Sequence, residues 1–226
     1  MKKALWMVAG LLVISLCSYA QDAPHWELFG GAQYSRLDIH DTQNALNLLA
    51  LETGTPAINV GTHLNGAGWN ISLQENPNSW FGLVFDIGGA YAKQDVNVTS
   101  LLTSIPGNTK IIRNKPSFYT YTGGPQFTYR KNPRFQPFGR VLLGLAYTRA
   151  SANLVIDGVP QLASDLTQSE NAFDFTLGGG VDYHFSKHVA FRTSADYIRT
   201  YFSSLTQNNV RVSAGLTYRW THSPVF

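Results

Sequence analysis

Three residues between positions 184 and 188 carry side chains that a hydrolase uses. Ser186 lies two positions from both His184 and His188. In a lipase-type site a histidine takes the proton of the serine hydroxyl, and an acid at the same rim orients that histidine. No acid stands at a spacing that singles out these three residues. We therefore interpret them as ordinary turn residues, with His184 projecting inward above the turn, and predict no catalytic residue.

Metal and cofactor chemistry has no better support in the sequence. The six histidines are scattered, and no two of them share a strand face at the spacing of a metal site. The glycine runs 123–124 and 178–180 lack the strand–turn–helix context of a phosphate-binding loop. We predict no metal ligand and no cofactor, and expect these glycines to relieve crowding and let strands curve.

The remaining charged side chains include a balanced set of acids and arginines on the polar face of alternating segments. Arginine suits enclosed ion pairs because its planar fork binds a carboxylate through two hydrogen bonds. The set predicts an ion-pair network that fills the lumen of a narrow barrel and leaves no open channel. Its members are Glu27, Asp86, Arg130, Arg140, Asp174, Asp182, Arg192, Asp196, Arg211 and Arg219.

Position along the chain predicts partners within this set. Counted from the short-turn ends of the strands, four charges fall at similar heights: Asp86, Arg140, Asp182 and Arg192. Three others fall higher: Asp174, Asp196 and Arg211. We expect Asp182 to contact Arg192 or Arg140, and Glu27 to neighbour Arg219 if the first and last strands close a barrel. Buried charges are costly unless paired, so such pairs specify closure and register more than they add stability.

Strands with a period of two would position these side chains. In the stretch from Asn171 to Phe185, the large apolar side chains fall on odd positions, and Asp174, Thr176, Asp182 and His184 fall on even ones, as in a strand whose faces meet different surroundings. The same alternation predicts eight strands at 25–37, 65–75, 79–92, 116–130, 135–149, 171–185, 189–200 and 208–220. Short turns alternate with mostly long loops. We predict an all-β fold: an eight-stranded antiparallel up-and-down transmembrane β-barrel with short periplasmic turns and long extracellular loops.

The composition of the polar face decides which face is inside. All five lysines that follow the leader fall in predicted loops or turns, so the apolar face is expected to meet lipid.

Pro125 cannot donate to the ladder, which predicts a bulge or a weakening of its strand. Aromatic rings at both strand ends predict two girdles at headgroup level. Their members are Trp26, Trp80, Tyr129, Phe185 and Trp220 at the short-turn end and Tyr34, Tyr91, Tyr119, Tyr147 and Tyr197 at the loop end.

The first twenty residues have the pattern of a secretory signal peptide. Lys2 and Lys3 precede an apolar stretch that ends in the small-x-small site 18–20. We expect cleavage near Ala20 and a barrel domain over 21–226; a membrane anchor and a lipoprotein signal at Cys17 are the alternatives. Without the leader the formal net charge of +3 falls to about +1, so charge gives no case for nucleic-acid binding. The mature chain keeps no cysteine and therefore no disulfide.

Two long loops are the places where recognition is expected, because binding residues evolve on loops of a rigid scaffold. Residues 38–64 contain Leu46, Leu48, Leu49 and Leu51, which predict a short helix lying over the barrel mouth. Residues 93–115 combine apolar side chains with Lys110, Arg113 and Lys115. These basic residues either meet lipopolysaccharide phosphates or are ordinary solvated charges.

Four segments, at 63–72, 80–86, 121–125 and 135–144, carry a resemblance to a known family. They resemble the outer-membrane β-barrel family related to OmpA and OmpX, and look most like uncharacterised Acidobacteria-like members. The resemblance implies integral insertion in the outer membrane of a Gram-negative bacterium by the barrel assembly machinery, among lipid and lipopolysaccharide. Tyr218 and Trp220 fit the aromatic last strand that this insertion uses, whereas Pro224 interrupts the pattern before Phe226.

These observations favour a non-enzymatic outer-membrane protein with a structural or surface-interaction role and an extracellular ligand that the sequence does not identify. A narrow pore for small solutes is the first alternative. A lipid-modifying barrel enzyme is the second.

Overall fold

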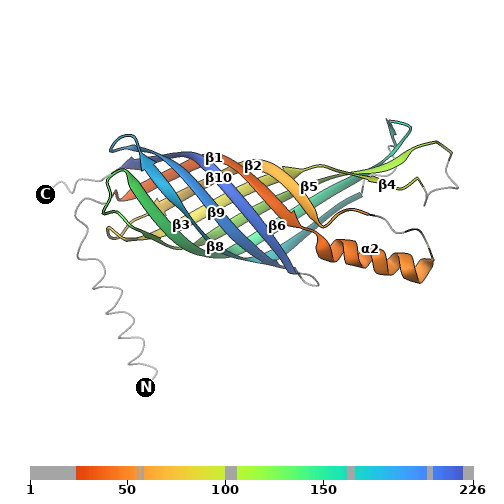
Figure 1. The fold of residues 1–226 in the computed structure, drawn as a ribbon, viewed down its shortest axis with the longest axis horizontal. Helices are drawn as coiled ribbons and strands as arrows, with labels where there is room; N and C mark the ends of the chain where they lie inside the picture. The colour runs from red at the N-terminus through yellow and green to blue at the C-terminus, as the bar shows by residue number, and fades with distance from the viewer. Residues whose placement is uncertain are drawn as a thin grey trace, which may run out of the picture.

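The computed structural model describes residues 24–54, 56, 59–99, 106–161, 166–202 and 206–220, and its strands form a barrel (Figure 1). The predicted signal peptide, its cleavage site and the residues Pro224 and Phe226 lie outside the described residues. The elements are β1 (Trp26–Asp38), α2 (His40–Thr53), β2 (His63–Glu75), β3 (Phe81–Ala92), β4 (Gln94–Asn97), β5 (Lys110–Thr128), β6 (Phe135–Ile156), β7 (Val159–Pro160), β8 (Leu166–His184), β9 (Val189–Tyr201) and β10 (Thr206–Trp220).

Eight of these strands close into an antiparallel barrel, as the alternation predicts. The hydrogen-bonded order runs β5-β3-β2-β1-β10-β9-β8-β6, and a pairing of β6 with β5 completes the ring. The first and last strands meet in a long ladder that begins with Trp26 opposite Trp220. Closure leaves no free edge in this part of the sheet, so every barrel strand has a hydrogen-bonded neighbour on both sides.

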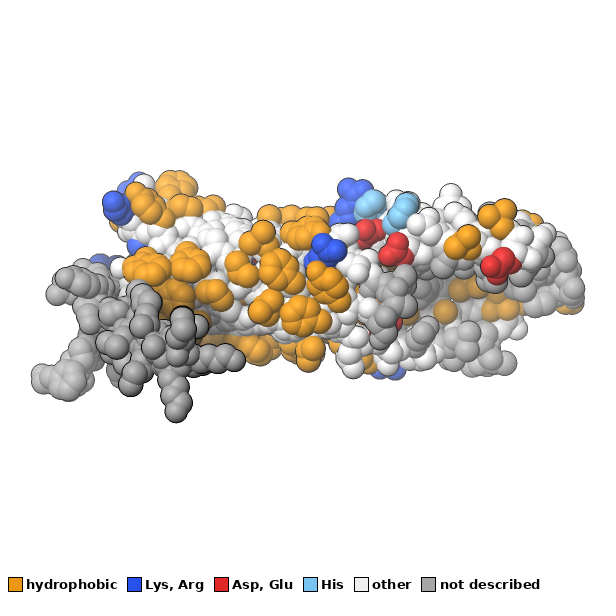
Figure 2. All heavy atoms as spheres, turned by 90° about the horizontal axis from the view of Figure 1, so that it is seen from below, with side chains coloured by type: hydrophobic (Ala, Val, Ile, Leu, Met, Phe, Trp, Pro, Cys, Tyr) orange, Lys and Arg blue, Asp and Glu red, His pale blue; other side chains and the backbone are white. Residues whose placement is uncertain are grey.

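The two faces of the wall divide by polarity. Leu177 is 52% exposed on the outer face, whereas Asp182 on the same strand is 1% exposed inside. Figure 2 shows hydrophobic side chains over the middle of the barrel, whereas most of the visible charged side chains lie toward its ends. Large exposed hydrophobic side chains include Leu28, Ile71, Phe85, Leu145, Val212 and Leu216. The predicted assignment of the apolar face to the outside is therefore confirmed.

Three strands extend at least five residues beyond their predicted ends. β5 begins six residues before the predicted 116, β6 ends seven residues after 149, and β8 begins five residues before 171. Residues 110–115 of β5, 150–156 of β6 and 166–170 of β8 continue with β4 and β7 as a paired sheet beyond the other strands (Figure 1). We call this sheet the extracellular slab. Lys110 and Lys115 therefore lie on a strand, and their placement in a loop was wrong. Arg113, Asn114 and Lys115 follow one another on β5, so the alternation that marks a membrane strand is absent there.

The helix predicted within residues 38–64 is present as α2. It follows β1 directly and ends at Gly54, whose backbone N–H donates to the carbonyl of Ala50 from a left-handed conformation that suits glycine. Figure 1 shows α2 pointing away from the barrel rim, so its predicted position over the mouth was wrong. Within the described residues no helix is long and apolar enough to cross a membrane.

Pro125 interrupts one ladder without a bulge. Gly123 pairs with Leu143 and Gln126 with Arg140 in the same register, but the two residues between them, Gly124 and Pro125, have no partner in β6. On its other side Pro125 still lies opposite Leu83 of β3. The predicted weakening is confirmed, and it stays local because one missing donor does not shift the register.

Gly178 is required where two strands and a buried carboxylate meet. It lies opposite Asp196 in the ladder, and a Cβ at this position would overlap the Asp196 carboxylate. Gly178→Ala is therefore expected to displace Asp196 and to lower the stability of the folded barrel by about 1–3 kcal/mol. Gly30→Ala on the outer face of β1 is the control, because a Cβ there meets nothing within 4 Å. Urea unfolding in lipid vesicles compares them, and equal losses would contradict the crowding argument.

Candidate functional site

Four charged side chains from four strands form a ring across the lumen. Arg140 of β6 lies 2.8 Å from Asp196 of β9 and 3.4 Å from Asp86 of β3. Arg211 of β10 lies 2.9 Å from Asp86 and 3.0 Å from Asp196. Each carboxylate therefore faces two guanidinium groups, and each guanidinium faces two carboxylates. We call these four residues the upper ring; all of them are almost completely buried.

Neutral side chains add hydrogen bonds to the upper ring. The Asn70 amide donates to both oxygens of Asp86, at 3.1 and 3.0 Å, and Arg211 donates to the Thr120 hydroxyl at 3.4 Å. Asp174 lies higher on β8 and makes no ion pair within the described residues. It accepts one hydrogen bond, from Thr176 at 2.8 Å, and its other oxygen has no partner there. Asp174 is thus the one predicted lumen charge that the structure leaves outside the pairs it describes.

The other five predicted lumen charges gather near the short turns. Glu27 lies 2.8 Å from Arg130, 2.9 Å from Arg192 and 3.5 Å from Arg219. Asp182 accepts two hydrogen bonds of 2.7 Å from Arg192, which is one of its two predicted partners. We call these five residues the lower cluster. It holds three guanidinium groups against two carboxylates, so it has an excess of positive charge.

The lower cluster also joins the first and last strands of the barrel. Glu27 and Arg219 are opposite each other in the ladder between β1 and β10. Arg130, which follows β5, donates to Glu27 and to the Asn76 side chain in the turn between β2 and β3. The Glu27 carboxylate of β1 therefore contacts both Arg219 of the neighbouring β10 and Arg130, which comes from the other side of the barrel.

Two aromatic rings separate the charged groups. The Arg192 guanidinium lies 4.8 Å from the centre of the Phe138 ring and 5.9 Å from that of Phe29, and Arg140 lies 6.0 Å from Phe138. Both rings point inward and are buried. A guanidinium over an aromatic face keeps a favourable electrostatic contact where water is excluded. Phe29 and Phe138 thus fill the space between the upper ring and the lower cluster.

The predicted heights of these charges were partly wrong. The sequence count placed Asp86 and Arg140 level with Asp182 and Arg192, but the first two pair with Asp196 and Arg211 instead. Barrel strands are tilted and staggered, so equal distances from a turn do not mean equal heights on strands that are not neighbours. Only strand register places these groups correctly.

An apolar layer closes the extracellular end of the lumen. Seven inward-facing residues from seven strands pack together and are at least nine-tenths buried. Sequence reasoning missed this layer, although its members share the parity of the polar face on their own strands. The residues are Leu37, Leu64, Ala92, Phe118, Ala146, Ala172 and Ile198.

The predicted girdle residues lie at the two ends of the outer wall. At the short-turn end, Trp80 stacks on Phe127, with ring centres 5.9 Å apart, and Trp220 lies 5.7 Å from Tyr218. At the loop end, Tyr119 contacts both Tyr91 and Tyr147. The remaining members, Trp26, Tyr34, Tyr129, Phe185 and Tyr197, are also exposed or partly exposed.

The residues with hydrolase chemistry are not assembled as a catalytic site. The Ser186 hydroxyl accepts hydrogen bonds from the backbone N–H groups of His188 and Val189, at 3.2 and 3.0 Å. The His188 ring stacks on Tyr218, and neither ring nitrogen of buried His184 has a hydrogen-bond partner among the described residues. Ser186 thus stabilises the turn. Within the same residues no group of three or more His, Cys, Asp or Glu side chains could hold a metal ion.

A closed eight-stranded wall that is apolar outside and charged inside is the architecture of a small integral outer-membrane barrel. The sequence comparison agrees with it. Residues 7–219 match the family model described as outer membrane protein beta-barrel domain, and the chain belongs to this family. No curated protein is significantly similar in sequence to the chain.

Solved structures of similar fold are outer-membrane proteins of low sequence identity. Ail, the attachment invasion locus protein of Yersinia pestis, is 16% identical with a TM-score of 0.48, and the match covers 87% of this chain and all of that one. The Neisserial surface protein A is 12% identical with a TM-score of 0.48, over 88% and 100% of the two chains. OprG from Pseudomonas aeruginosa is 16% identical with a TM-score of 0.45, over 90% and 99%.

Proposed function

We propose that this chain is a non-conducting barrel of a Gram-negative outer membrane, exported with cleavage near Ala20, whose role is structural or lies in surface interaction. The lipid around its wall includes lipopolysaccharide, and insertion uses the barrel assembly machinery. The observation that carries this proposal is the filling of the lumen at three levels. From the periplasm outward these are the lower cluster, the upper ring and the apolar layer.

The three levels oppose conduction for different physical reasons. The charges of the upper ring neutralise each other across the lumen, so an entering ion would have to replace a buried ion pair. Breaking such a pair by removing one partner costs about 3–5 kcal/mol. The apolar layer offers no polar group to replace the hydration shell of an ion. A narrow pore for small solutes, the alternative function, would need all three levels to open together.

Conductance in planar lipid bilayers tests this part of the proposal. The refolded mature chain is expected to give no steady conductance, whereas an open porin in the same membranes gives stepwise currents. Stable single-channel steps from the mature chain would contradict the proposal and favour the pore. Gel mobility before and after heating controls for folding, because only folded barrels of this kind resist denaturation in cold detergent.

The extracellular slab is the surface that we assign to recognition. It extends β5, β6 and β8 beyond the barrel, and its charged side chains include an exposed ion pair of 3.2 Å between Arg113 and Asp95. Exposed residues on a rigid scaffold are suited to binding, and a sheet continuous with the wall holds them in fixed positions. The ligand class remains to be found by a screen.

A shortened hairpin makes this assignment testable. Ser151 and Thr167 are ladder partners in β6 and β8, so residues 152–166 can be replaced by an Asn-Gly turn that connects them. The shortened and full-length barrels are compared for binding to lipopolysaccharide, host matrix proteins and phage. We expect any binding of the full-length barrel to be lost with the hairpin, while heat-modifiable mobility is kept. Equal binding by both proteins would contradict the assignment.

A further inference from the structure

The periplasmic mouth of the barrel contains a strongly cationic cavity. Its volume is about 650 Å³, and it opens between the turn that joins β5 to β6 and the turn that joins β8 to β9. Of the residues that the structure describes, no aspartate or glutamate lines it, and four fixed cations do: Arg130, Arg134, Lys187 and Arg219. We call it the periplasmic pocket.

Among the described residues, the groups around the periplasmic pocket do not balance its charge. The lower cluster beneath it already has one more guanidinium than carboxylate. Arg134 and Lys187 add two further cations, and neither has an ion-pair partner within the described residues. Grouped cations with few carboxylates repel one another, so the site favours an anion that enters from the periplasm.

Three residues that line the pocket also carry buried nitrogen atoms without hydrogen bonds. The Nε atoms of Arg130 and Arg219 and both ring nitrogens of His184 are buried and make no hydrogen bond to any described residue, although the Arg219 Nε lies 3.5 Å from a Glu27 oxygen in an ion pair. Arg219 and His184 are only 8% and 9% exposed. Buried polar groups that lack hydrogen bonds are unusual in folded proteins and call for a partner. Arg130, His184 and Arg219 line one pocket, so an anion there would meet the positive charge of both arginines.

From these observations we propose that the periplasmic pocket binds a phosphate group. Guanidinium groups pair with the oxygens of phosphate through two parallel hydrogen bonds, and lysine adds a point charge. An adjoining aromatic cluster favours an acidic phospholipid as the source. Tyr183 lies 5.0 Å from Phe135 and 5.1 Å from Phe185, measured between ring centres, and Phe185 both lines the pocket and is exposed. Acyl chains would contact these rings while the headgroup enters the pocket.

The test measures binding by the full mature barrel in a phosphate-free maltoside detergent. Isothermal titration compares inorganic phosphate, dihexanoyl phosphatidylglycerol and dihexanoyl phosphatidylcholine at one ionic strength. We expect phosphatidylglycerol to bind at least tenfold more tightly than phosphatidylcholine. Tighter binding of phosphatidylglycerol than of inorganic phosphate supports the lipid source, whereas equal binding supports a phosphate site that takes a free anion. No heat of binding for either anion would overturn the proposal.

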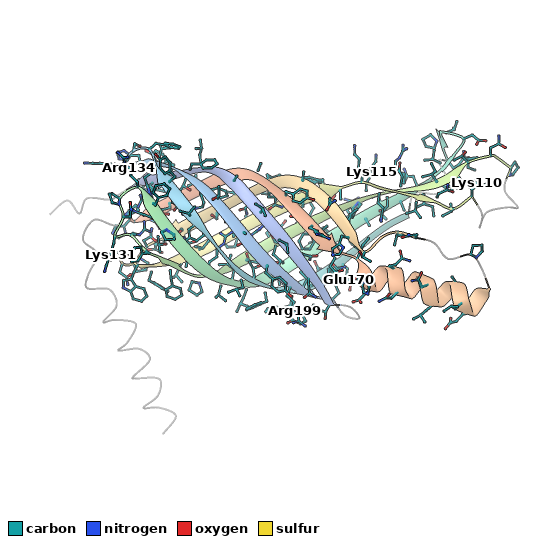
Figure 3. The ribbon with its side chains drawn as sticks, in the orientation of Figure 1. Lys110, Lys115, Lys131, Arg134, Glu170 and Arg199 are labelled. Atoms are coloured by element: carbon teal, nitrogen blue, oxygen red, sulfur yellow. The ribbon has the colours of Figure 1, made fainter. Side chains whose placement is uncertain are left out.

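Variants in the turns locate the site. The double variant Arg134→Gln with Lys187→Gln is expected to weaken anion binding at least tenfold and to keep its heat-modifiable mobility, because neither side chain is part of the ion pairs inside the barrel. Arg134→Lys with Lys187→Arg should retain binding. Lys131→Gln is the control, because Lys131 lies at the same end of the barrel as Arg134 (Figure 3). Its side chain is outside the pocket and over the Tyr129 ring. Unchanged binding by the double variant, or an equal loss in Lys131→Gln, would overturn the assignment.

Discussion

Glu27→Gln is expected to lower the free energy of unfolding of the barrel by about 3–5 kcal/mol, because it leaves three buried guanidinium groups with the single carboxylate of Asp182. The side chain keeps nearly the same volume, so the loss reports charge and not packing. Urea unfolding in lipid vesicles, followed by tryptophan fluorescence, measures it. The folded band on a gel should also disappear at a lower temperature.

A matched substitution separates burial from charge in this experiment. Asp95→Asn removes a carboxylate from an ion pair with Arg113 in which both side chains are about half exposed. Exposed pairs contribute about 0–1 kcal/mol, so this variant should unfold almost like the parent. Arg219→Gln added to Glu27→Gln should restore part of the loss, because the pair is then removed as a unit. If Glu27→Gln and Asp95→Asn cost the same, the lower cluster would not hold the barrel closed.

Asp196→Asn is expected to cost a similar amount, about 3–5 kcal/mol, by opening the upper ring. Arg140 donates two hydrogen bonds to Asp196, at 3.0 and 2.8 Å, and Arg211 donates a third at 3.0 Å. Without this carboxylate both guanidinium groups depend on Asp86 alone. The same unfolding measurement applies, and an amide exchange experiment should show earlier exchange in β9 and β10 than in the parent protein.

Asp174→Asn is the control for the upper ring. Asp174 is as fully buried from solvent as Asp196, but it faces Thr176 and no arginine at ion-pair distance among the described residues. An asparagine can accept the same hydrogen bond from Thr176 and avoids burying an unpaired charge. We expect this variant to be as stable as the parent or more stable. A loss as large as that of Asp196→Asn would mean that lumen charge as such, and not the ring, holds the strands together.

The barrel wall was predictable because its strands have an apolar outer face and a polar inner face, and side chains that alternate between two such faces follow a period of two residues. Along β8, Phe173 and Leu177 face outward and Asp174 and Asp182 inward, and that alternation is visible in the sequence. The neighbours Glu27 and Arg219 also followed from closure alone, since antiparallel strands that start and end at one rim must meet there. Strand identity and the direction of each face therefore needed no knowledge of the three-dimensional structure.

Three features of the structure were not predicted from the sequence. The slab carries polar residues on both faces, so β5 near Lys110 and Lys115 has no membrane alternation and was assigned to a loop. The apolar layer was detectable in principle, because Leu37 and Ile198 follow the parity of the polar face, but a search for charges inside the barrel passes over it. The grouping of Asp182 with Asp86 failed because depth depends on stagger between strands, which a single strand does not reveal.

The continuity of β5, β6 and β8 from the short turns to the tip of the slab has a mechanical consequence. No hinge separates the outer part from the wall, since the ladder between β6 and β8 runs unbroken from Phe135 opposite Tyr183 to Ala152 opposite Leu166. A pull on the tip directed along the strands would load this ladder in shear, with its many hydrogen bonds bearing force at the same time. A ligand bound at the tip would thus be connected to the barrel wall through one stiff, continuous sheet.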